Sequence, residues 1–319
     1  MAAVPLYFKS HSYGEYIFDW AWASAAERAG LSYYPKLVSA VPFTPVTGRR
    51  LLTGTQPLEG ALLDTLCAAL EQTASELGAS SYHLLFLTPE EHALLEDRSR
   101  LIGRITHQYH WKNNGYQSFE DWLGHFRSRR RKEVLRERAR AAELGTTVSV
   151  LRGEELTPRH WEAIERYYLS TVAKKHAYAY LERSFFERLQ QELKHLVMAF
   201  VAENEHEVVA TSLCFQQGQS LFGRYWGCQP KYRGLHFELC YHLPIQTCIE
   251  NSWHQFEAGA QGRHKIQRGL MPSPTYSVHR IGHTGLAHAV EQAIEQENIM
   301  ETLDMKTLSQ RGPFRRCQT

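Results

Sequence analysis

Apolar and polar positions recur along the chain with two periods, and each change of period marks a new element. Leucines recur near 3.6 residues over 57–77, which predicts a helix. The apolar run 81–87 and the alternating run 104–113 predict strands. Residues 3–10 also favour a strand, and the aromatic segment 13–29 favours a helix. The predicted order of elements in the first half is therefore β-α-β-β-α-β-α-β.

The second half reads β-α-α-β-β-β-α-β. Its predicted elements are 146–151, 158–176, 183–194, three strands between 195 and 229, 235–250 and 254–260. The first half has the same order without the opening strand and helices, so we expect a domain truncated at its N-terminus. A long basic helix capped by Ser118, with Asp121 at the capping-box position, joins the halves. The predicted fold class is α/β, of the mixed (α+β) kind, with two similar halves.

Four segments follow from this order of elements. They are an incomplete first half over 1–116, a basic connecting helix over 117–145, a second half over 146–285, and a C-terminal helix and tail over 286–319. A chain of 319 residues is longer than one usual compact domain, which also favours two domains or two similar halves.

Composition narrows the class of protein. Apolar residues make up 43% of the chain and the net charge is +2, so any nucleic-acid site must be a local basic patch. The six cysteines include no CxxC pair, which argues against a zinc ribbon or a disulfide scaffold. No stretch approaches 18 apolar residues, so no membrane span is expected. These features predict a cytoplasmic protein.

The stretch FEAGAQGRHKIQRGLMPSPTYS, residues 256–277, ends a predicted strand with many polar groups. Glu257, Gly259 and Gln261 share one face of that strand. A core strand rarely ends in so many hydrogen-bonding groups unless a ligand binds there. The predicted substrate-binding residues of this stretch are Gln261, His264, Lys265 and Arg268.

Several long strings resemble the FemAB-like proteins, which are tandem GNAT chains. The strings are LYFKSHSYGEYIFDWAWA, YYPKLVSAVPFTPVTGRRLL, GRYWGC, LHFELCYH and the stretch at 256–277, and the resemblance covers residues 4 to about 282. It implies two GNAT-like halves and an N-acyltransferase that moves an acyl or aminoacyl group from acyl-CoA or aminoacyl-tRNA to an amine. The family's default acceptor is a peptidoglycan precursor. The competing class is a non-catalytic binding protein that keeps the cleft for a peptidoglycan-type or nucleotide-linked ligand.

The resemblance also locates the loop that in an ordinary GNAT protein cradles the acetyl-CoA pyrophosphate at a helix N-terminus. Here the loop reads QPKYRGLHFELC, and His236 stands where a second small residue is expected. An imidazole there would crowd a closely approaching phosphate. We therefore expect no bound cofactor in this half.

In the GNAT fold the strands at 221–228 and 254–260 splay apart and leave a cleft. Acyl transfer needs a base for the amine and a group that steadies charge. The candidate base is Glu257 or His236, and the candidate for charge is Arg224 or Lys265. Alternatively, Arg224 and Glu257 form a structural ion pair.

Residues 126–140 carry eight basic and two acidic side chains. Helical spacing pairs Glu133 with Arg129 and Arg136, and Glu137 with Arg140, which favours a self-paired, solvated helix. The remaining basic residues would instead meet phosphates of tRNA or a nucleotide-sugar lipid. They are Arg127, Arg130, Arg131 and Lys132.

The segment SHSYGEYIFDWAW, residues 10–22, is dense in aromatic side chains. Such a segment is either core or the wall of a cleft that binds sugar or peptide. Lys9, His11 and Tyr13 are the substrate-binding candidates of the second interpretation.

No metal site is predicted. His279 and His283 are four residues apart, but Gly282 between them argues against a helix. Cys228 with His236 is either a nucleophile pair or, more simply, a small buried thiol near an imidazole.

Overall fold

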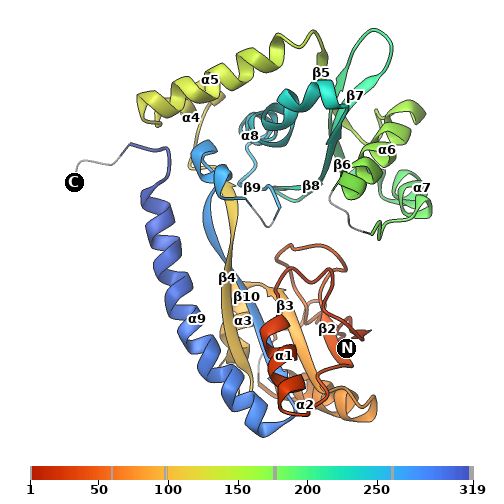
Figure 1. The fold of residues 1–319 in the computed structure, drawn as a ribbon, viewed down its shortest axis with the longest axis vertical. Coiled ribbons are helices and arrows are strands. Elements are labelled where there is room, and N and C mark those ends of the chain that lie inside the picture. Colours follow the sequence, from red (N-terminus) through yellow and green to blue (C-terminus); the bar gives the residue numbers. More distant parts are fainter. Residues whose placement is uncertain are drawn as a thin grey trace. The chain divides into compact units, whose positions relative to one another are not determined.

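The computed structural model describes residues 2–58, 60–96, 98, 100–174, 178–259 and 262–315. The chain forms two compact units, Met1–Gln108 with Ser273–Thr307, and Tyr109–Pro272 with Leu308–Thr319. The chain passes between the units within the strands β4 (Ile102–Lys112) and β10 (Met271–Ile281) and near the end of the helix α9 (Thr284–Gln310) (Figure 1). The described strands form a mixed sheet in the order β1-β2-β3-β10-β4-β9-β8-β7-β6-β5.

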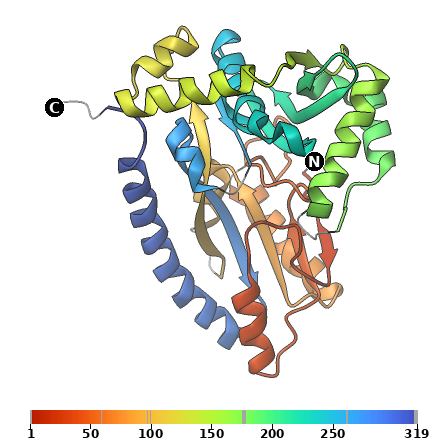
Figure 2. The ribbon, with the colours of Figure 1, turned by 45° about the horizontal axis from the view of Figure 1, so that its top comes forward.

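The first unit is built around the buried strand β3. Its elements are β1 (Tyr7–Lys9), α1 (Trp20–Arg28), β2 (Lys36–Ser39), α2 (Gly60–Glu76), β3 (Ser81–Leu87), α3 (Pro89–Glu96) and α9 (Thr284–Gln310). The last residues of α9 fall in the second unit. Leu63, Leu66 and Leu70 of α2 pack in one core cluster with residues of β3. Helix α9 runs alongside β4 (Figure 2), where Asn298 Oδ1 accepts a hydrogen bond from the Ile105 amide at 2.8 Å.

The second unit packs helices against an antiparallel meander. Its strands are β5 (Thr147–Arg152), β6 (Val197–Glu203), β7 (Val208–Gln217), β8 (Ser220–Cys228) and β9 (Gln255–Glu257). Its helices are α4 (Phe119–Gly124), α5 (Ser128–Ala142), α6 (Pro158–Lys174), α7 (Arg183–Glu192) and α8 (Leu243–Glu250), with the short turns η1 (Lys194–Leu196), η2 (Pro230–Leu235), η3 (Glu238–His242) and η4 (Arg263–Arg268). Strands β5 to β8 pair antiparallel in chain order.

The mixed α/β class and the predicted order of elements in the second half are confirmed. The predicted single helix over 117–145 is wrong, because the structure has two helices there, α4 and α5. Between them Phe126 is buried and forms an isolated bridge to Phe314, and Arg127 takes an extended conformation with ψ 141°. Packing of one aromatic residue thus interrupts a segment whose composition favours an unbroken helix.

Strand β10 is absent from the sequence-based prediction, because Pro272 and Pro274 lie at its start and proline disfavours a sheet interior. Its described pairing with β3 runs from Tyr276 to Ile281, beyond both prolines. The strand returns the chain to the first unit, and the domain boundaries at 116, 145 and 285 stay a prediction.

Candidate functional site

Strand β9 ends at Glu257, and its pairing with β8 ends at the same point. The parallel register joins Ser220–Phe222 of β8 to Gln255–Glu257, although β8 itself continues to Cys228. On its other edge β9 pairs antiparallel with β4, where Glu257 lies opposite His110. Glu257 therefore occupies the position at which β8 continues without β9 as a partner.

The Glu257 carboxyl is buried with an incomplete set of hydrogen bonds. The residue is 4% exposed, and Gln255 Nε2 donates to its Oε1 at 2.6 Å. Among the described residues Oε2 has no hydrogen-bond partner, and His110 Nε2 lies 3.8 Å from it. Burial raises the pKa of Glu257 to about 7, against the opposing effect of the Gln255 hydrogen bond. A carboxyl that titrates near neutrality can accept and release a proton.

Lys265 is a second buried group that titrates near neutrality. It lies in η4, is 2% exposed, and donates to the Gly259 carbonyl at 2.6 Å. Burial lowers the pKa of Lys265 to about 8, and the neighbouring Cys240 thiol acts in the opposite direction. Gly262, with φ 116°, precedes η4 in a conformation that L side chains rarely adopt. This turn positions the Lys265 ammonium. Its described hydrogen bond uses one N–H donor, so the other donors can meet a ligand.

Arg268 and His264 are held by protein partners. Arg268 Nε donates to Glu137 Oε2 at 3.0 Å, and its guanidinium lies 3.4 Å from the Phe237 ring centroid. His264 Nε2 and the Tyr241 hydroxyl are 2.9 Å apart. The predicted pairing of Glu137 with Arg140 is therefore corrected, since Glu137 faces inward and also contacts His242 at 2.9 Å. Gln261, the remaining residue predicted in this stretch, lies outside the described residues.

His236 sits in a cluster of aromatic rings at the loop that follows β8. Its ring centroid lies 5.3 Å from that of Trp226, 5.3 Å from that of Phe237 and 5.5 Å from that of Tyr241. A Cβ atom added at Gly234 would approach Leu144 Cδ1 to 3.3 Å. The loop is thus packed by side chains, and the weak binding of acetyl-CoA stays a prediction.

Arg224 contacts its neighbour Tyr225. Its Nη2 lies 3.3 Å from the Tyr225 hydroxyl, and its guanidinium carbon lies 5.2 Å from that ring centroid. The contacts described for the Glu257 side chain are instead with Gln255 and His110. His110 is a site residue that sequence reasoning missed, because the register that places β4 beside β9 cannot be derived from alternation alone.

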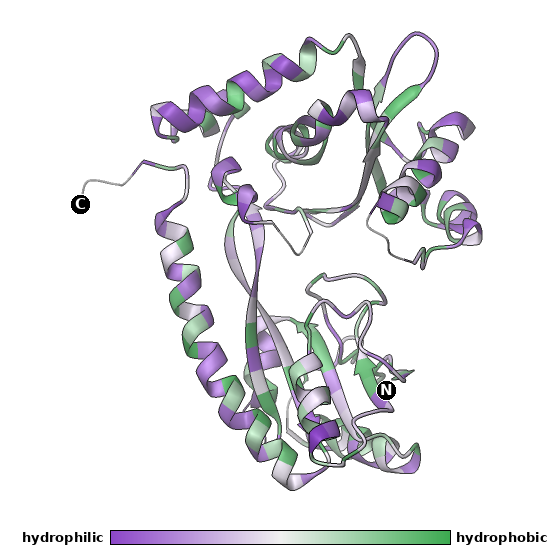
Figure 3. Cartoon of the chain, viewed as in Figure 1, coloured by the Kyte–Doolittle hydropathy of each residue, from purple (hydrophilic) through white to green (hydrophobic). Residues whose placement is uncertain are grey.

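Helix α5 carries the basic run, and hydrophilic colour covers most of its length (Figure 3). Arg127 donates to the backbone carbonyls of Gly312 at 2.6 Å and Phe314 at 3.0 Å, which gives it a structural role. Arg130 pairs with Glu133 at 2.6 Å, whereas the sequence pattern paired Glu133 with other arginines. Arg131 is half-buried and Lys132 is exposed.

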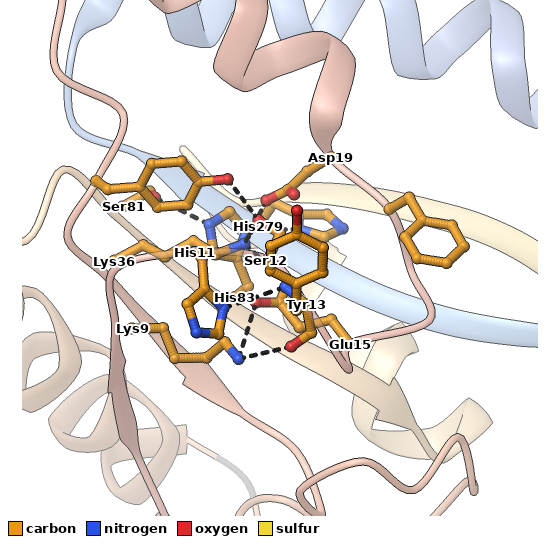
Figure 4. Close-up of polar contacts among 12 residues, drawn as sticks. Lys9, His11, Ser12, Tyr13, Glu15, Asp19, Lys36, Ser81, His83 and His279 are labelled. Atoms are coloured by element: carbon orange, nitrogen blue, oxygen red, sulfur yellow. Dashed lines mark hydrogen bonds and ion pairs between the residues drawn. The ribbon is translucent and has the colours of Figure 1, made fainter. Parts of the chain in front are cut away.

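A polar cluster in the first unit gathers around Lys36 (Figure 4). The fully buried Lys36 ammonium donates to Ser12 at 2.7 Å, to Glu15 at 2.8 Å and to Asp19. Of the predicted residues, Lys9 donates to the Tyr13 carbonyl at 3.0 Å and lies 3.7 Å from Glu15. The Tyr13 amide donates to His11 Nδ1 at 3.3 Å. Lys9, His11 and Tyr13 therefore lie together at the edge of this cluster.

Two histidines of the first unit form a buried pair. His83 Nδ1 and His279 Nδ1 are 2.8 Å apart, and Ser81 and Ser277 each contact one outer nitrogen at 2.9 Å. Burial, and then the positive charge of Lys36, lowers the pKa of His83, and burial lowers that of His279 as well. Sequence analysis compared His279 with His283 and argued against a shared site, and it could not reveal His83, which lies 196 positions away on β3.

Two further observations concern metals and membranes. Within the described ranges, no group of three or more His, Cys, Asp or Glu side chains is placed to hold a metal ion. None of the described helices is both long and apolar enough to cross a membrane.

Burial raises the pKa of the Cys228 thiol, which makes it a weaker candidate for a nucleophile beside His236.

Comparison with known proteins gives one family and a set of similar folds. The FemAB-like family model, described as peptidoglycan biosynthesis/recognition, matches residues 1–316. No curated protein sequence matches. The C-terminal domain of an Agrobacterium fabrum protein described as a lysylphosphatidylglycerol synthetase has a TM-score of 0.56, with 11% identity over 82% of each chain. L-PGS from Bacillus licheniformis has a TM-score of 0.54, with 12% identity over 90% of this chain and 85% of its own. At these identities the two structures show a shared fold.

Proposed function

Because the chain belongs to the FemAB-like family, we propose that it is an N-acyltransferase, which moves an acyl or aminoacyl group from an activated donor to an amine. We further propose that its two units are GNAT-like halves and that the acceptor is the amine of a peptidoglycan precursor. The family description, with its reference to peptidoglycan, supports the acceptor. The donor is an aminoacyl-tRNA or an acyl-CoA.

The single observation that carries this proposal is the Glu257 carboxyl at the end of β9. It is buried, Oε2 has no hydrogen-bond partner among the described residues, and the pKa is raised to about 7. A buried carboxyl of this kind costs stability in its ionised form unless it is compensated, which favours a chemical role over a structural one.

In the proposed reaction the acceptor nitrogen attacks the acyl carbonyl carbon and a C–N bond forms. Glu257 takes the proton that the nitrogen must lose, and the C–O or C–S bond to the donor breaks. The leaving oxygen or sulfur then recovers a proton from Glu257 or from solvent. A positioned base contributes roughly 10²–10⁴-fold to such a step.

Lys265 complements Glu257 in this scheme. Its ammonium donates to one backbone carbonyl, and the remaining N–H donors suit the negative charge that develops on the acyl oxygen. His236, Arg224, His264 and Arg268 contact rings or protein partners, and we assign them to the surrounding shape of the site.

A second candidate function is a binding protein without transfer chemistry. The observation that favours it is the packed aromatic loop around His236, where the CoA pyrophosphate would lie in an ordinary GNAT protein. Under this alternative a peptidoglycan-type or nucleotide-linked ligand binds and is released unchanged.

Transfer assays separate the two functions. The purified protein is incubated with labelled aminoacyl-tRNA or acetyl-CoA and a peptidoglycan precursor that carries a free amine. Mass spectrometry then detects the mass that the acyl or aminoacyl group adds to the precursor. We expect Glu257→Gln to lower turnover by roughly 10²–10⁴-fold, and Lys265→Ala to lower turnover as well, because its ammonium meets the negative charge that develops on the acyl oxygen. The exposed Glu250→Gln is the matched control. Binding of the precursor without transfer from either donor would favour the second function.

A further inference from the structure

The carboxylate oxygen Oε2 of Glu257 has a neighbour that no hydrogen bond yet joins to it. His110 Nε2 lies 3.8 Å away, and the two residues are direct cross-strand partners of β4 and β9. Such a position fixes the two Cβ atoms about 4.5–5.5 Å apart, so small side-chain rotations change the distance between the polar atoms. A shortening by about 1 Å would bring Nε2 and Oε2 within hydrogen-bond range.

His110 is neutral where Glu257 titrates. It is buried, and desolvation lowers its pKa to about 3, with Lys112 and Lys265 acting in the same direction. A neutral imidazole carries one N–H, which can be placed on Nε2. Gln255 also acts on the pair, because it donates to Glu257 Oε1, and Cys240 acts on Lys265.

We propose that His110 is the positioning residue of Glu257, and that its Nε2–H closes onto Glu257 Oε2 when the carboxyl ionises and withdraws when the carboxyl is protonated. This inference rests on the proposed function, in which Glu257 carries the proton of the acceptor amine. The neutral imidazole keeps its own proton throughout. Catalytic hydrogen bonds are often longer without substrate than in the reacting complex. The 3.8 Å between His110 Nε2 and Glu257 Oε2 fits this behaviour.

The consequence for the reaction is a carboxylate with a fixed orientation. Gln255 would hold Oε1 and His110 would hold Oε2 in the ionised state, so the free lone pairs point in one direction. When the amine proton arrives on the carboxylate, the contact with His110 weakens and the acid is released to protonate the leaving group. A purely structural His110 would leave the titration of Glu257 unchanged.

The test measures the titration midpoint of Glu257 directly, without donor or acceptor. The full-length protein is labelled with ¹³C at glutamate side-chain carboxyls, and the Glu257 signal is identified by its loss in Glu257→Gln. His110→Leu and His110→Met remove the donor with two side-chain shapes, so that misfolding of one leaves the other. His110→Gln keeps an N–H donor, and Lys112→Gln removes only a nearby charge.

We expect the midpoint of Glu257 to rise by about one pH unit or more in His110→Leu or His110→Met, which corresponds to about 1.4 kcal/mol. We expect His110→Gln to keep the midpoint near that of the wild type. Equal midpoints in the wild type and both apolar variants would overturn the inference, and so would a rise in His110→Gln as large as in His110→Leu. Because no substrate is present, these outcomes are independent of whether transfer activity is found.

Discussion

Two buried clusters, one in each unit, compensate charge in opposite ways. In the first unit the Lys36 ammonium meets Ser12, Glu15 and Asp19, so each of its N–H donors has an acceptor. In the second unit Glu257 and Lys265 are equally buried, yet their described contacts are with uncharged groups and a neutral imidazole. Buried charge that lies beside an opposite charge stabilises a loop, whereas buried charge without one favours binding of a ligand or transfer of a proton.

The pKa values of Asp19 and Glu257 follow the same division, whereas that of Glu15 does not. Burial pushes the pKa of Asp19 upward, but Lys36, Ser12 and Tyr33 outweigh it and the pKa is lowered. Burial raises the pKa of Glu15 despite Lys36. Around Glu257 the hydrogen bond from Gln255 does not outweigh burial, and the pKa of Glu257 rises to about 7.

The largest effect should come from breaking the Lys36 cluster. Lys36→Met leaves Glu15 and Asp19 buried without their cation, and we expect a loss of about 3–5 kcal/mol in the free energy of unfolding. Lys265→Met removes a buried charge that has no carboxylate partner among the described residues, so we expect little or no loss of stability at pH 7. Urea unfolding of both variants measures the difference. Equal losses would erase the distinction between the two units.

The pH dependence of stability tests the Glu257 side of the comparison. The folded pKa of about 7 lies above the ordinary value of 4.5, so the stability present at low pH is lost as pH rises through 7. Glu257→Gln cannot ionise, and we expect it to gain up to about 3 kcal/mol over the wild type between pH 5 and pH 9. Thermal melts across this range measure the gain. Glu250→Gln should show no such trend, and a flat difference for Glu257→Gln would contradict its raised pKa.

The histidine pair of the first unit predicts an effect of the opposite sign. His83 and His279 have folded pKa values below the ordinary 6.5, so stability is lost as pH falls below 6.5. The slope should approach about 1.4 kcal/mol per pH unit for each proton taken up. In a double variant with Leu at both positions, the melting temperature should fall less than in the wild type as pH is lowered from 6.5 to 5. If the melting temperature of the double variant fell as steeply as that of the wild type, other groups would cause the loss of stability in acid.

The smallest effect concerns helix α5. Arg131 and Lys132 remain as surface candidates for phosphate, since Arg127 and Arg130 have protein partners. If tRNA binds there, each change to Gln should reduce the log–log salt slope of binding by about 1. Filter binding at several salt concentrations measures the slope, with the exposed Arg183→Gln of α7 as the control. An unaltered slope in the double variant would make α5 a structural helix only.

Much of this arrangement could be predicted from the sequence, and the gaps have physical causes. The alternating and helical periods located the elements of the second half, and the polar end of β9 pointed to Glu257 and Lys265. His110 and Lys36 carry no local signal, because their roles depend on strand register and on a distant loop. The break between α4 and α5 depends on Phe126 meeting Phe314, a contact that periodicity cannot show.

The transfer rate as a function of pH tests the central claim that Glu257 is held as a base. Because the ionised form accepts the amine proton, the rate should rise with pH through a midpoint near 7, the pKa of Glu257. It should fall again above about 8 if the Lys265 ammonium is needed, since its pKa is lowered to about 8. Glu257→Gln should lose the rising limb together with roughly 10²–10⁴-fold of the rate. A rising limb that survives unchanged in Glu257→Gln would contradict the account and assign the proton transfer to another group.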